Sequence, residues 1–134
     1  MPKNSKKPTR RKLIQKLDTV FSRWVRLSNT DNRGYCKCVT CNKQFHWKNI
    51  QAGHFMSRKH YSTRWDEKNV FPQCVGCNVY RSGEQYKYSI YLGKKTSEEM
   101  YIKSKQIVKY TSLEIQYLIN KYTELVKDLE KKYI

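Results

Sequence analysis

The spacing of apolar residues predicts two long amphipathic helices, one near each end of the chain. In the first, apolar residues recur every three or four positions, which places them on one helical face. These residues are Leu13, Leu17, Phe21, Trp24 and Leu27. Thr9 is a candidate N-cap, and the polar residues 29–34 end the helix. We expect the apolar face to pack on the cysteine-containing middle part of the chain.

The second long helix begins at a capping box, in which the side chains of Thr111 and Glu114 would each accept the other's backbone N–H. Its apolar stripe consists of Ile115, Leu118, Tyr122, Leu125, Leu129 and Tyr133. Amphipathic helices usually cover the core of their own chain, so we expect the stripe to contact the first helix. Packing against a second copy of the chain, which would give a homodimer, is the alternative.

Shorter elements are predicted between the two helices. Capping-box patterns at Ser82 and Thr96 indicate helices that run through Leu92 and toward Ile107, separated by Gly93. The other expected elements are a strand or hairpin over 35–47, a hairpin turn near 48–49, a second strand over 51–55, a basic loop over 57–68 and a short helix over 75–81. The pattern therefore predicts an α+β fold that is mostly helical.

The charge of the chain is strongly positive. Its 134 residues include 28 lysines and arginines against 11 acidic residues, which gives a formal net charge of +17. Such an excess favours binding to nucleic acid, because contact with phosphates releases condensed counterions. A basic protein of ribosomal or chromatin type that catalyses no reaction would share this feature, so charge alone does not separate the two classes.

The length fits one domain with extensions. Residues 1–12 carry six basic residues and no acid, and we expect them to form a flexible basic arm ahead of a single domain over 13–134. The N-terminus lacks the apolar segment of a secretory signal, and no apolar run reaches the length of a membrane span. We therefore expect a soluble, cytoplasmic protein with reduced cysteines.

Two Cys-x-x-Cys turns predict a zinc site. The first is formed by Cys38 and Cys41, and the second by Cys74 and Cys77. Each turn directs two sulfurs toward one point, and four thiolates complete the tetrahedron that Zn²⁺ prefers and leave no open position. The ion would therefore be structural and would hold together a chain with a modest core. The spacing of Cys36 to Cys38 is less suited to this turn, and we leave Cys36 out of the site.

His54 and Asn78 are the candidate catalytic pair. Hydrolysis of a phosphodiester needs an activated water and relief of negative charge on the phosphoryl and leaving oxygens. A neutral imidazole can take a proton from water, and an amide oxygen is a hard ligand suited to Mg²⁺ or Mn²⁺. Because Asn78 follows Cys77, the zinc site would fix its direction. Asn69 could support His54 through a hydrogen bond to the strand or loop that positions it.

Several other side chains are candidates for contacts with DNA. The candidate phosphate contacts are Arg58, Lys59, Arg64 and Arg81. Tyrosines could stack on unpaired bases, although most tyrosines at helical spacing belong to the core or its rim. The tyrosines considered are Tyr80, Tyr86, Tyr88 and Tyr91.

Four segments carry a resemblance to a known family. They are Ala-Gly-His-Phe at 52–55, Arg-Trp-Asp-Glu-Lys-Asn-Val at 64–70, Gln-Cys-Val-Gly-Cys-Asn at 73–78 and Ser-Gly at 82–83. Together they resemble the phage recombination protein family NinG, also called Rap. The resemblance runs from about Lys12 to the C-terminal helix and is densest between Cys38 and Gly83. The Cys-x-x-Cys-Asn ending is also similar to endonuclease VII-type junction resolvases of the HNH, or His-metal finger, superfamily.

This resemblance implies both a fold and an activity. The expected parts are a zinc-stapled, treble-clef-like ββα-metal core over about 35–92 and flanking helices over 13–28 and 96–133. The expected activity is Mg²⁺-dependent cleavage of branched recombination intermediates such as Holliday junctions or D-loops. Carried onto this chain, the resemblance makes His54 the general base and Asn78 the catalytic metal ligand, with Asn69 as the middle Asn of the HNH pattern.

One departure from the HNH pattern leaves the ligands of the catalytic metal open. Many HNH enzymes place a carboxylate before the base histidine, whereas this chain has Gly53. Mg²⁺ held by Asn78 and waters is our working hypothesis, and Gln51, His60 or Asp66 could instead supply a second ligand. Two other functions also stay open: a zinc-stabilised nucleic-acid-binding protein without catalysis, and an HNH nuclease of homing or packaging type.

Overall fold

A computed structural model describes residues 7–133, so the first six residues of the predicted basic arm, and residue 134, lie outside the described residues. Within that range the chain is α+β, mainly helical, with two small antiparallel sheets. The helices are α1 (Arg10–Ser28), α2 (Tyr61–Arg64), α3 (Gln85–Leu92), α4 (Lys94–Ser104) and α5 (Ser112–Glu130). The strands are β1 (Tyr35–Lys37), β2 (Gln44–His46), β3 (Gln51–His54) and β4 (Val70–Gln73). A short 3-10 turn covers Trp47–Asn49, and a π turn covers Gly76–Tyr80.

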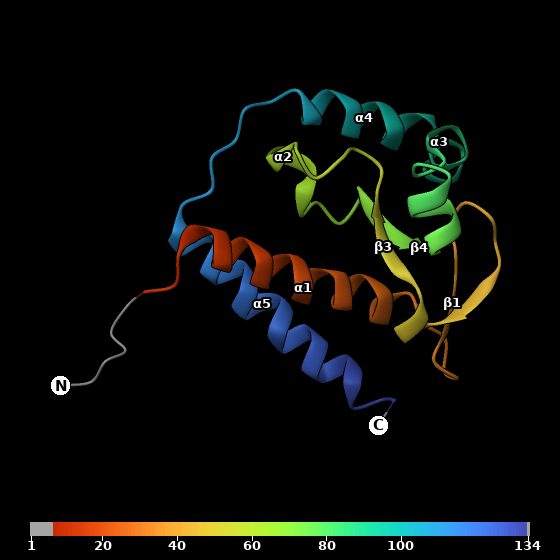
Figure 1. Cartoon of the computed structure of the whole chain (residues 1–134), viewed down its shortest axis with the longest axis horizontal. Coiled ribbons are helices and arrows are strands. Elements are labelled where there is room, and N and C mark those ends of the chain that lie inside the picture. The colour runs from red at the N-terminus through yellow and green to blue at the C-terminus, as the bar shows by residue number, and fades with distance from the viewer. Residues whose placement is uncertain (1–6, 134) are drawn as a thin grey trace.

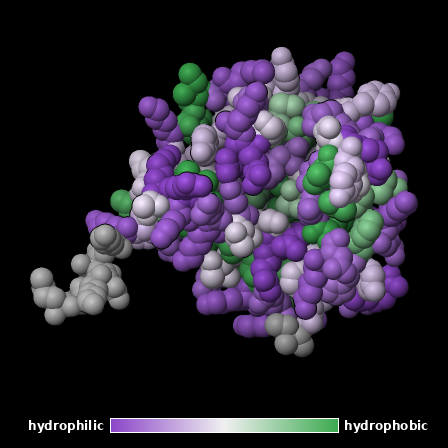
Figure 2. All heavy atoms as spheres, in the orientation of Figure 1, coloured by the Kyte–Doolittle hydropathy of each residue, from purple (hydrophilic) through white to green (hydrophobic). Residues whose placement is uncertain are grey.

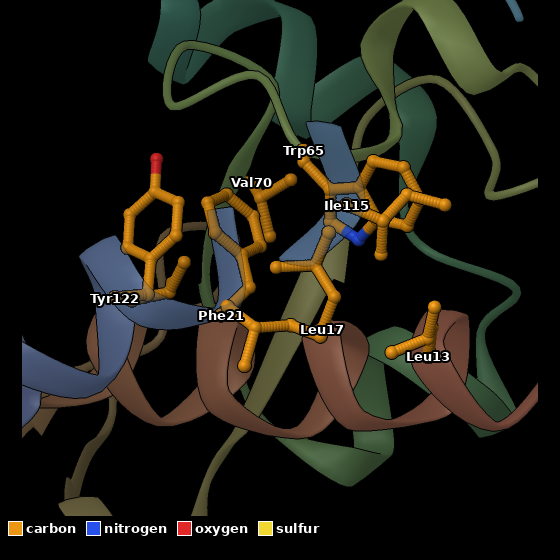
Figure 3. Packing of buried hydrophobic residues seen from close by; sticks show 9 residues of the cluster. Leu13, Leu17, Phe21, Trp65, Val70, Ile115 and Tyr122 are labelled. Carbon is orange, nitrogen blue, oxygen red and sulfur yellow. The ribbon is translucent and has the colours of Figure 1, made fainter. Parts of the chain in front are cut away.

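α1 and α5 lie side by side and start at the same end of the molecule (Figure 1). Their apolar faces meet in one core, to which β4 and the segment after α2 add Val70 and Trp65 (Figure 3). Phe21 of α1 and Tyr122 of α5 pack edge to face, with ring centroids 4.9 Å apart. The last helix therefore covers the first, as its apolar stripe predicts, and α1 also contacts both strands of the β3–β4 sheet.

Both long helices have the predicted N-caps. The Thr9 hydroxyl oxygen accepts a hydrogen bond from the N–H of Lys12 at 3.2 Å, so residues 10–12 belong to α1 and not to an extended arm. At α5 the capping box is complete: the Thr111 hydroxyl accepts from the N–H of Glu114 at 3.1 Å, and the Glu114 carboxylate accepts from the N–H of Thr111 at 3.0 Å. These bonds satisfy N–H groups that a helix cannot pair internally.

The hairpin predicted over 35–47 forms, but the hairpin turn predicted near 48–49 does not. β1 pairs antiparallel with β2. The predicted turn near 48–49 is a 3-10 turn that leads out of this sheet, and β3 pairs instead with β4, which sets His54 opposite Val70. The sequence pattern misses β4 because it contains Pro72, and a proline, which has no backbone N–H, argues against a strand interior. For β3, pairing with the distant β4 therefore replaces the predicted pairing with the strand just before it.

Two predicted helix starts are wrong. The N-cap of α3 is Glu84, which makes no side-chain capping bond, so the capping box at Ser82 does not form. Ser82 and Glu84 have positive φ angles of 53° and 49°, which turn the chain sharply ahead of the helix. α4 begins at Lys94, directly after Gly93, and not at Thr96. Gly93 has a φ angle of 85°, a conformation that glycine adopts without strain.

Hydrophilic residues cover most of the face shown in Figure 2.

Among the tyrosines considered for base stacking, Tyr80 and Tyr86 are 80% and 78% exposed. Tyr88 is instead fully buried and donates its hydroxyl hydrogen to the carbonyl of Gly53 at 2.6 Å, so it belongs to the core. In the part of the chain that the structure describes, no helix combines the length and the apolar character needed to cross a membrane.

Replacing Thr111 by alanine removes the hydroxyl that caps α5. We expect Thr111→Ala to lower the free energy of unfolding by about 1 kcal/mol, because an N–H group at the helix start loses its acceptor. Ser112→Ala, at the exposed first residue of the helix, is the matched control and should change stability by less than roughly 0.5 kcal/mol. Urea unfolding followed by circular dichroism measures both variants. Equal effects of the two substitutions would contradict the capping role.

Candidate metal centre and active site

Four cysteine sulfurs form one cluster. The Sγ atoms of Cys38, Cys41, Cys74 and Cys77 all lie within 4.8 Å of one another. The sulfurs of Cys41 and Cys74 are 3.8 Å apart. A tetrahedron with Zn–S bonds of about 2.3 Å has an edge of roughly 3.8 Å, so the donor set fits a structural Zn²⁺ ion with no open position. Cys36 is buried in β1 and is not a member of the cluster.

The surroundings of the sulfurs favour the thiolate form at Cys38 and oppose it at Cys41 and Cys74. Arg81, predicted as a phosphate contact, donates from Nη2 to the sulfur of Cys77 at 3.1 Å. At Cys38 burial opposes ionisation, but hydrogen bonds from the Thr40 hydroxyl and from backbone N–H groups outweigh it and lower the pKa to about 6. Burial, together with the neighbouring cysteine sulfurs, raises the pKa of Cys41 to about 12. Four packed thiolates therefore need a shared cation, which is what zinc would supply.

His54 ends β3 and is hydrogen-bonded to the last residue of α2. Its Nε2 is 2.9 Å from the carbonyl oxygen of Arg64. A carbonyl only accepts, so Nε2 carries the proton, and in the neutral ring Nδ1 keeps the lone pair. Burial is the main reason that the pKa of His54 falls from 6.5 to about 4. The hydrogen bond to the Arg64 carbonyl raises the pKa, and the positive charge of Arg58 lowers it further. The imidazole is therefore neutral at pH 7, in the tautomer that offers Nδ1 as a base.

His54 and Asn78 line the same cavity, which has a volume of about 680 Å³. His54 comes from β3, and Asn78 comes from the π turn that follows β4. Gln51, at the start of β3, also lines the cavity, and its Oε1 accepts a hydrogen bond from Asn78 Nδ2 at 2.8 Å. This bond orients the amide of Asn78. The Oδ1 atom of Asn78 makes no hydrogen bond to the described residues. An amide oxygen in this arrangement can serve as a ligand for Mg²⁺.

His60 and Asp66, the other residues considered as a second metal ligand, do not line this cavity. The two carboxylate oxygens of Asp66 accept hydrogen bonds from Lys103 Nζ at 2.5 Å and from the N–H of Lys68 at 2.9 Å. His60 occupies the N-cap position of α2. Gln51 is thus the candidate that the fold brings to Asn78.

Gln73 explains the glycine that precedes His54. A Cβ on Gly53 would lie 2.0 Å from Gln73 Oε1, closer than any real contact, so only glycine fits. Gln73 is fully buried, and its Nε2 donates to the Thr40 hydroxyl at 3.1 Å and to the Gly83 carbonyl at 2.8 Å. Its Oε1 receives no hydrogen bond from the described residues and rests on the Gly53 backbone. The position before His54 is therefore closed to a carboxylate ligand.

Asn69 connects the segment after His54 to α2, a helix that lies inside the predicted basic loop. It is 0% exposed. Its Oδ1 accepts from the N–H of Met56 at 2.8 Å, and its Nδ2 donates to the carbonyls of Met56 and Thr63, each at 3.0 Å. Thr63 precedes the residue whose carbonyl holds His54, so Asn69 fixes the chain on either side of that hydrogen bond.

Two of the other predicted phosphate contacts remain accessible and one does not. Arg58 lines the cavity, and Lys59 is exposed next to it in the chain. Arg64 instead forms an ion pair with Asp18 of α1, and its side chain is only 14% exposed. Asp18 lies 46 residues earlier in the chain, so a pattern of local charge cannot reveal this pairing.

α1 supplies part of the cavity lining, although its periodicity indicates only a core helix. The lining residues from α1 are Asp18, Phe21, Ser22 and Arg26. Hydrophobic periodicity identifies the apolar face of a helix but does not indicate what its polar residues meet. One weak signal was present, because Asp18 is the single acidic residue among the first 30.

The geometry defines a small α+β protein with a four-cysteine site that could bind a structural zinc ion. A family model described as "NinG: Bacteriophage Lambda NinG protein" matches residues 2–132. The chain therefore belongs to the NinG family, as the motifs in its middle part predict. No curated protein and no solved structure matches it.

Loss of one cluster sulfur should remove the metal and unfold much of the surrounding structure. We expect the purified wild type to hold one zinc per chain, and Cys74→Ser to lose it together with the cooperative melt, because three thiolates bind zinc far more weakly. Cys36→Ala, outside the cluster, is the matched control and should keep the zinc. Metal analysis and calorimetry measure both effects. A chelated protein that keeps a full, cooperative melt would show that the zinc assignment is wrong.

The imidazole of His54 should stay neutral well below pH 6.5. The pKa of His54 in the folded state is about 4, against 6.5 as its ordinary value. Between these pH values the unfolded chain binds a proton that the folded protein does not, so this residue lowers stability as the pH falls through that window. Titration of the ring by ¹⁵N NMR measures the pKa directly. A midpoint at or above pH 6.5 would contradict the burial of the ring.

Proposed function

We propose that this protein is a metal-dependent DNA endonuclease that cuts branched recombination intermediates such as Holliday junctions or D-loops. The observation that carries the proposal is the shared cavity of His54 and Asn78, in which a neutral imidazole and an amide oxygen are both available. In this proposal, β3, β4 and the π turn that bears Asn78 form the ββα-metal core of an HNH enzyme.

Four residues of the cavity have a defined role in the proposed reaction. Nδ1 of His54 takes a proton from the attacking water. A bound Mg²⁺ or Mn²⁺ would relieve negative charge on the phosphoryl and leaving oxygens. Oδ1 of Asn78 would hold this ion, and Gln51 would orient the amide or add a second oxygen. Arg58, at the same cavity, would pair with the scissile phosphate.

Three features support branched DNA as the substrate. The net charge of +17 favours a polyanion. The chain belongs to the NinG family, and the resemblance to this family implies a role in phage recombination. Tyr80 and Tyr86 are exposed, close in sequence to the cavity residues Asn78 and Gln85, and could stack on bases that a branch point leaves unpaired. Symmetric cutting of a four-way junction needs two active sites, so the proposal includes a homodimer.

Replacement of His54 by alanine should abolish cleavage while binding persists. With Mg²⁺, wild-type protein should nick a synthetic four-way junction, and His54→Ala should cut it at least about 100-fold more slowly because the general base is lost. The Kd for the junction should change less than roughly twofold, since His54 is not one of the cationic contacts. His60→Ala, outside the cavity, is the matched control and should cut at the wild-type rate.

The same assay separates the proposal from the other two functions. A linear duplex of the same sequence should be cut much more slowly than the junction; equal cutting would favour an HNH nuclease of homing or packaging type. Protein that binds the junction tightly but never cuts it with Mg²⁺ or Mn²⁺ would favour a zinc-stabilised binding protein. A His54→Ala variant that cuts at the wild-type rate would show that the base is misassigned.

A further inference from the structure

We propose that Asp18 of α1 is a positioning residue for the general base: it fixes the carbonyl of Arg64 that holds the ring of His54. The inference rests on the proposed role of His54, but the contacts that carry it do not depend on catalysis. α1 thereby contributes to the catalytic cavity as well as to the core.

Asp18 anchors the end of α2 through three hydrogen bonds. Its Oδ1 accepts from Arg64 Nε at 3.1 Å and from the indole N–H of Trp65 at 2.9 Å, and its Oδ2 accepts from Arg64 Nη2 at 2.5 Å. The third arm of the guanidinium, Nη1, donates to the carbonyl of Arg58 at 2.8 Å. The side chains of Arg64 and Trp65 are therefore both hydrogen-bonded to the carboxylate of Asp18. The guanidinium of Arg64 also binds the loop that precedes α2, at Arg58.

The anchor matters because α2 cannot hold its own shape. It has four residues, and its N-cap makes no side-chain capping bond. A helix of this length has no stability of its own, so the place of the Arg64 carbonyl is set by tertiary contacts. Asn69 fixes the carbonyl of Thr63, and Asp18 fixes the side chains of Arg64 and Trp65. The carbonyl that accepts from His54 lies between these two anchors.

The charges favour this role over direct binding of a metal or of DNA. Both oxygens of Asp18 already accept hydrogen bonds, and the positive charge of Arg64 beside them disfavours a metal ion at the same carboxylate. The side chains of Asp18 and Arg64 are only 19% and 14% exposed, and each charge compensates the other. A carboxylate that lines a cavity for phosphate would repel the substrate, and the bidentate pair with Arg64 cancels that repulsion.

The consequence for the base is a choice of tautomer. Nδ1 of His54 can accept a proton only while the hydrogen is on Nε2, and the bond to the Arg64 carbonyl selects that form. If the carbonyl moves away, the ring can rotate or shift its proton to Nδ1, and a fraction of molecules loses the base. This loss lowers kcat and leaves the cationic contacts with DNA in place.

Asp18→Asn tests the proposal, because the amide places an N–H₂ group against the guanidinium. We expect kcat for junction cleavage to fall about tenfold to hundredfold, as for a small misplacement of a catalytic group, with KM within about twofold. ¹⁵N NMR of His54 at neutral pH should show the Nε2–H tautomer in the wild type and a mixture in the variant. Glu130→Gln is the matched control, since it removes another ion pair of α1, with Arg23, away from the cavity.

The outcomes distinguish this inference from the proposed function. Asp18→Asn with an unchanged kcat and a single tautomer would overturn it, and so would a loss carried by KM with the tautomer unchanged. If Asp18→Asn does not fold, Arg64→Lys, which keeps the charge but loses the fork, should show the same tautomer mixture, and a single tautomer there would overturn the inference. If wild-type protein cuts no DNA, the proposed function fails, while the tautomer measurement still decides whether Asp18 positions His54.

Discussion

The four-sulfur cluster is the constraint on which the rest of the site depends. It joins Cys38 and Cys41, after β1, to Cys74, directly after β4, and Cys77, in the π turn. A chain of this length with such short strands buries a modest core, and an ion bound by four thiolates would hold these turns together where burial does not. Asn78 follows the last sulfur, and its N–H donates to the carbonyl of Cys74 at 2.8 Å. Zinc binding would thereby set the position of the amide oxygen in the cavity.

The cluster is connected to His54 by a chain of buried contacts. The hydroxyl of Thr40 lies 3.4 Å from the Cys38 sulfur and accepts a hydrogen bond from Gln73 at 3.1 Å. Because the single hydroxyl hydrogen is then free to point at the sulfur, this arrangement favours the thiolate form of Cys38. Gln73, in turn, lies against Gly53, the residue before His54. The cysteine cluster and His54 therefore share the β3–β4 pair, which supports an ordered site in a small protein.

The sequence predicts well those features of the structure that depend on residues close to one another in the chain. The caps at Thr9 and Thr111 and the two Cys-x-x-Cys turns involve groups within a few residues of one another, so spacing locates them. The β3–β4 pairing and the Asp18–Arg64 ion pair join distant segments, and no local signal specifies either partner. The capping box at Ser82 fails for a related reason. The chain turns sharply there after the cysteine cluster, and a residue with positive φ does not have the extended backbone that an N-cap needs.

In the proposed function, the glycine before His54 limits how many charged groups could bind the catalytic metal. A carboxylate side chain at position 53 would need the space that Gln73 occupies. The amide of Gln73 connects β4 to the cysteine loop through a hydrogen bond to Thr40. The fold therefore has this hydrogen bond and no carboxylate ligand at position 53. The oxygens left in the cavity, from Asn78 and Gln51, are neutral. Mg²⁺ is usually bound through carboxylates together with substrate phosphates, and a neutral pair alone would bind it weakly. In the proposed function the phosphate of DNA would therefore complete the metal site, so metal and substrate would bind cooperatively and the free protein would hold little catalytic metal.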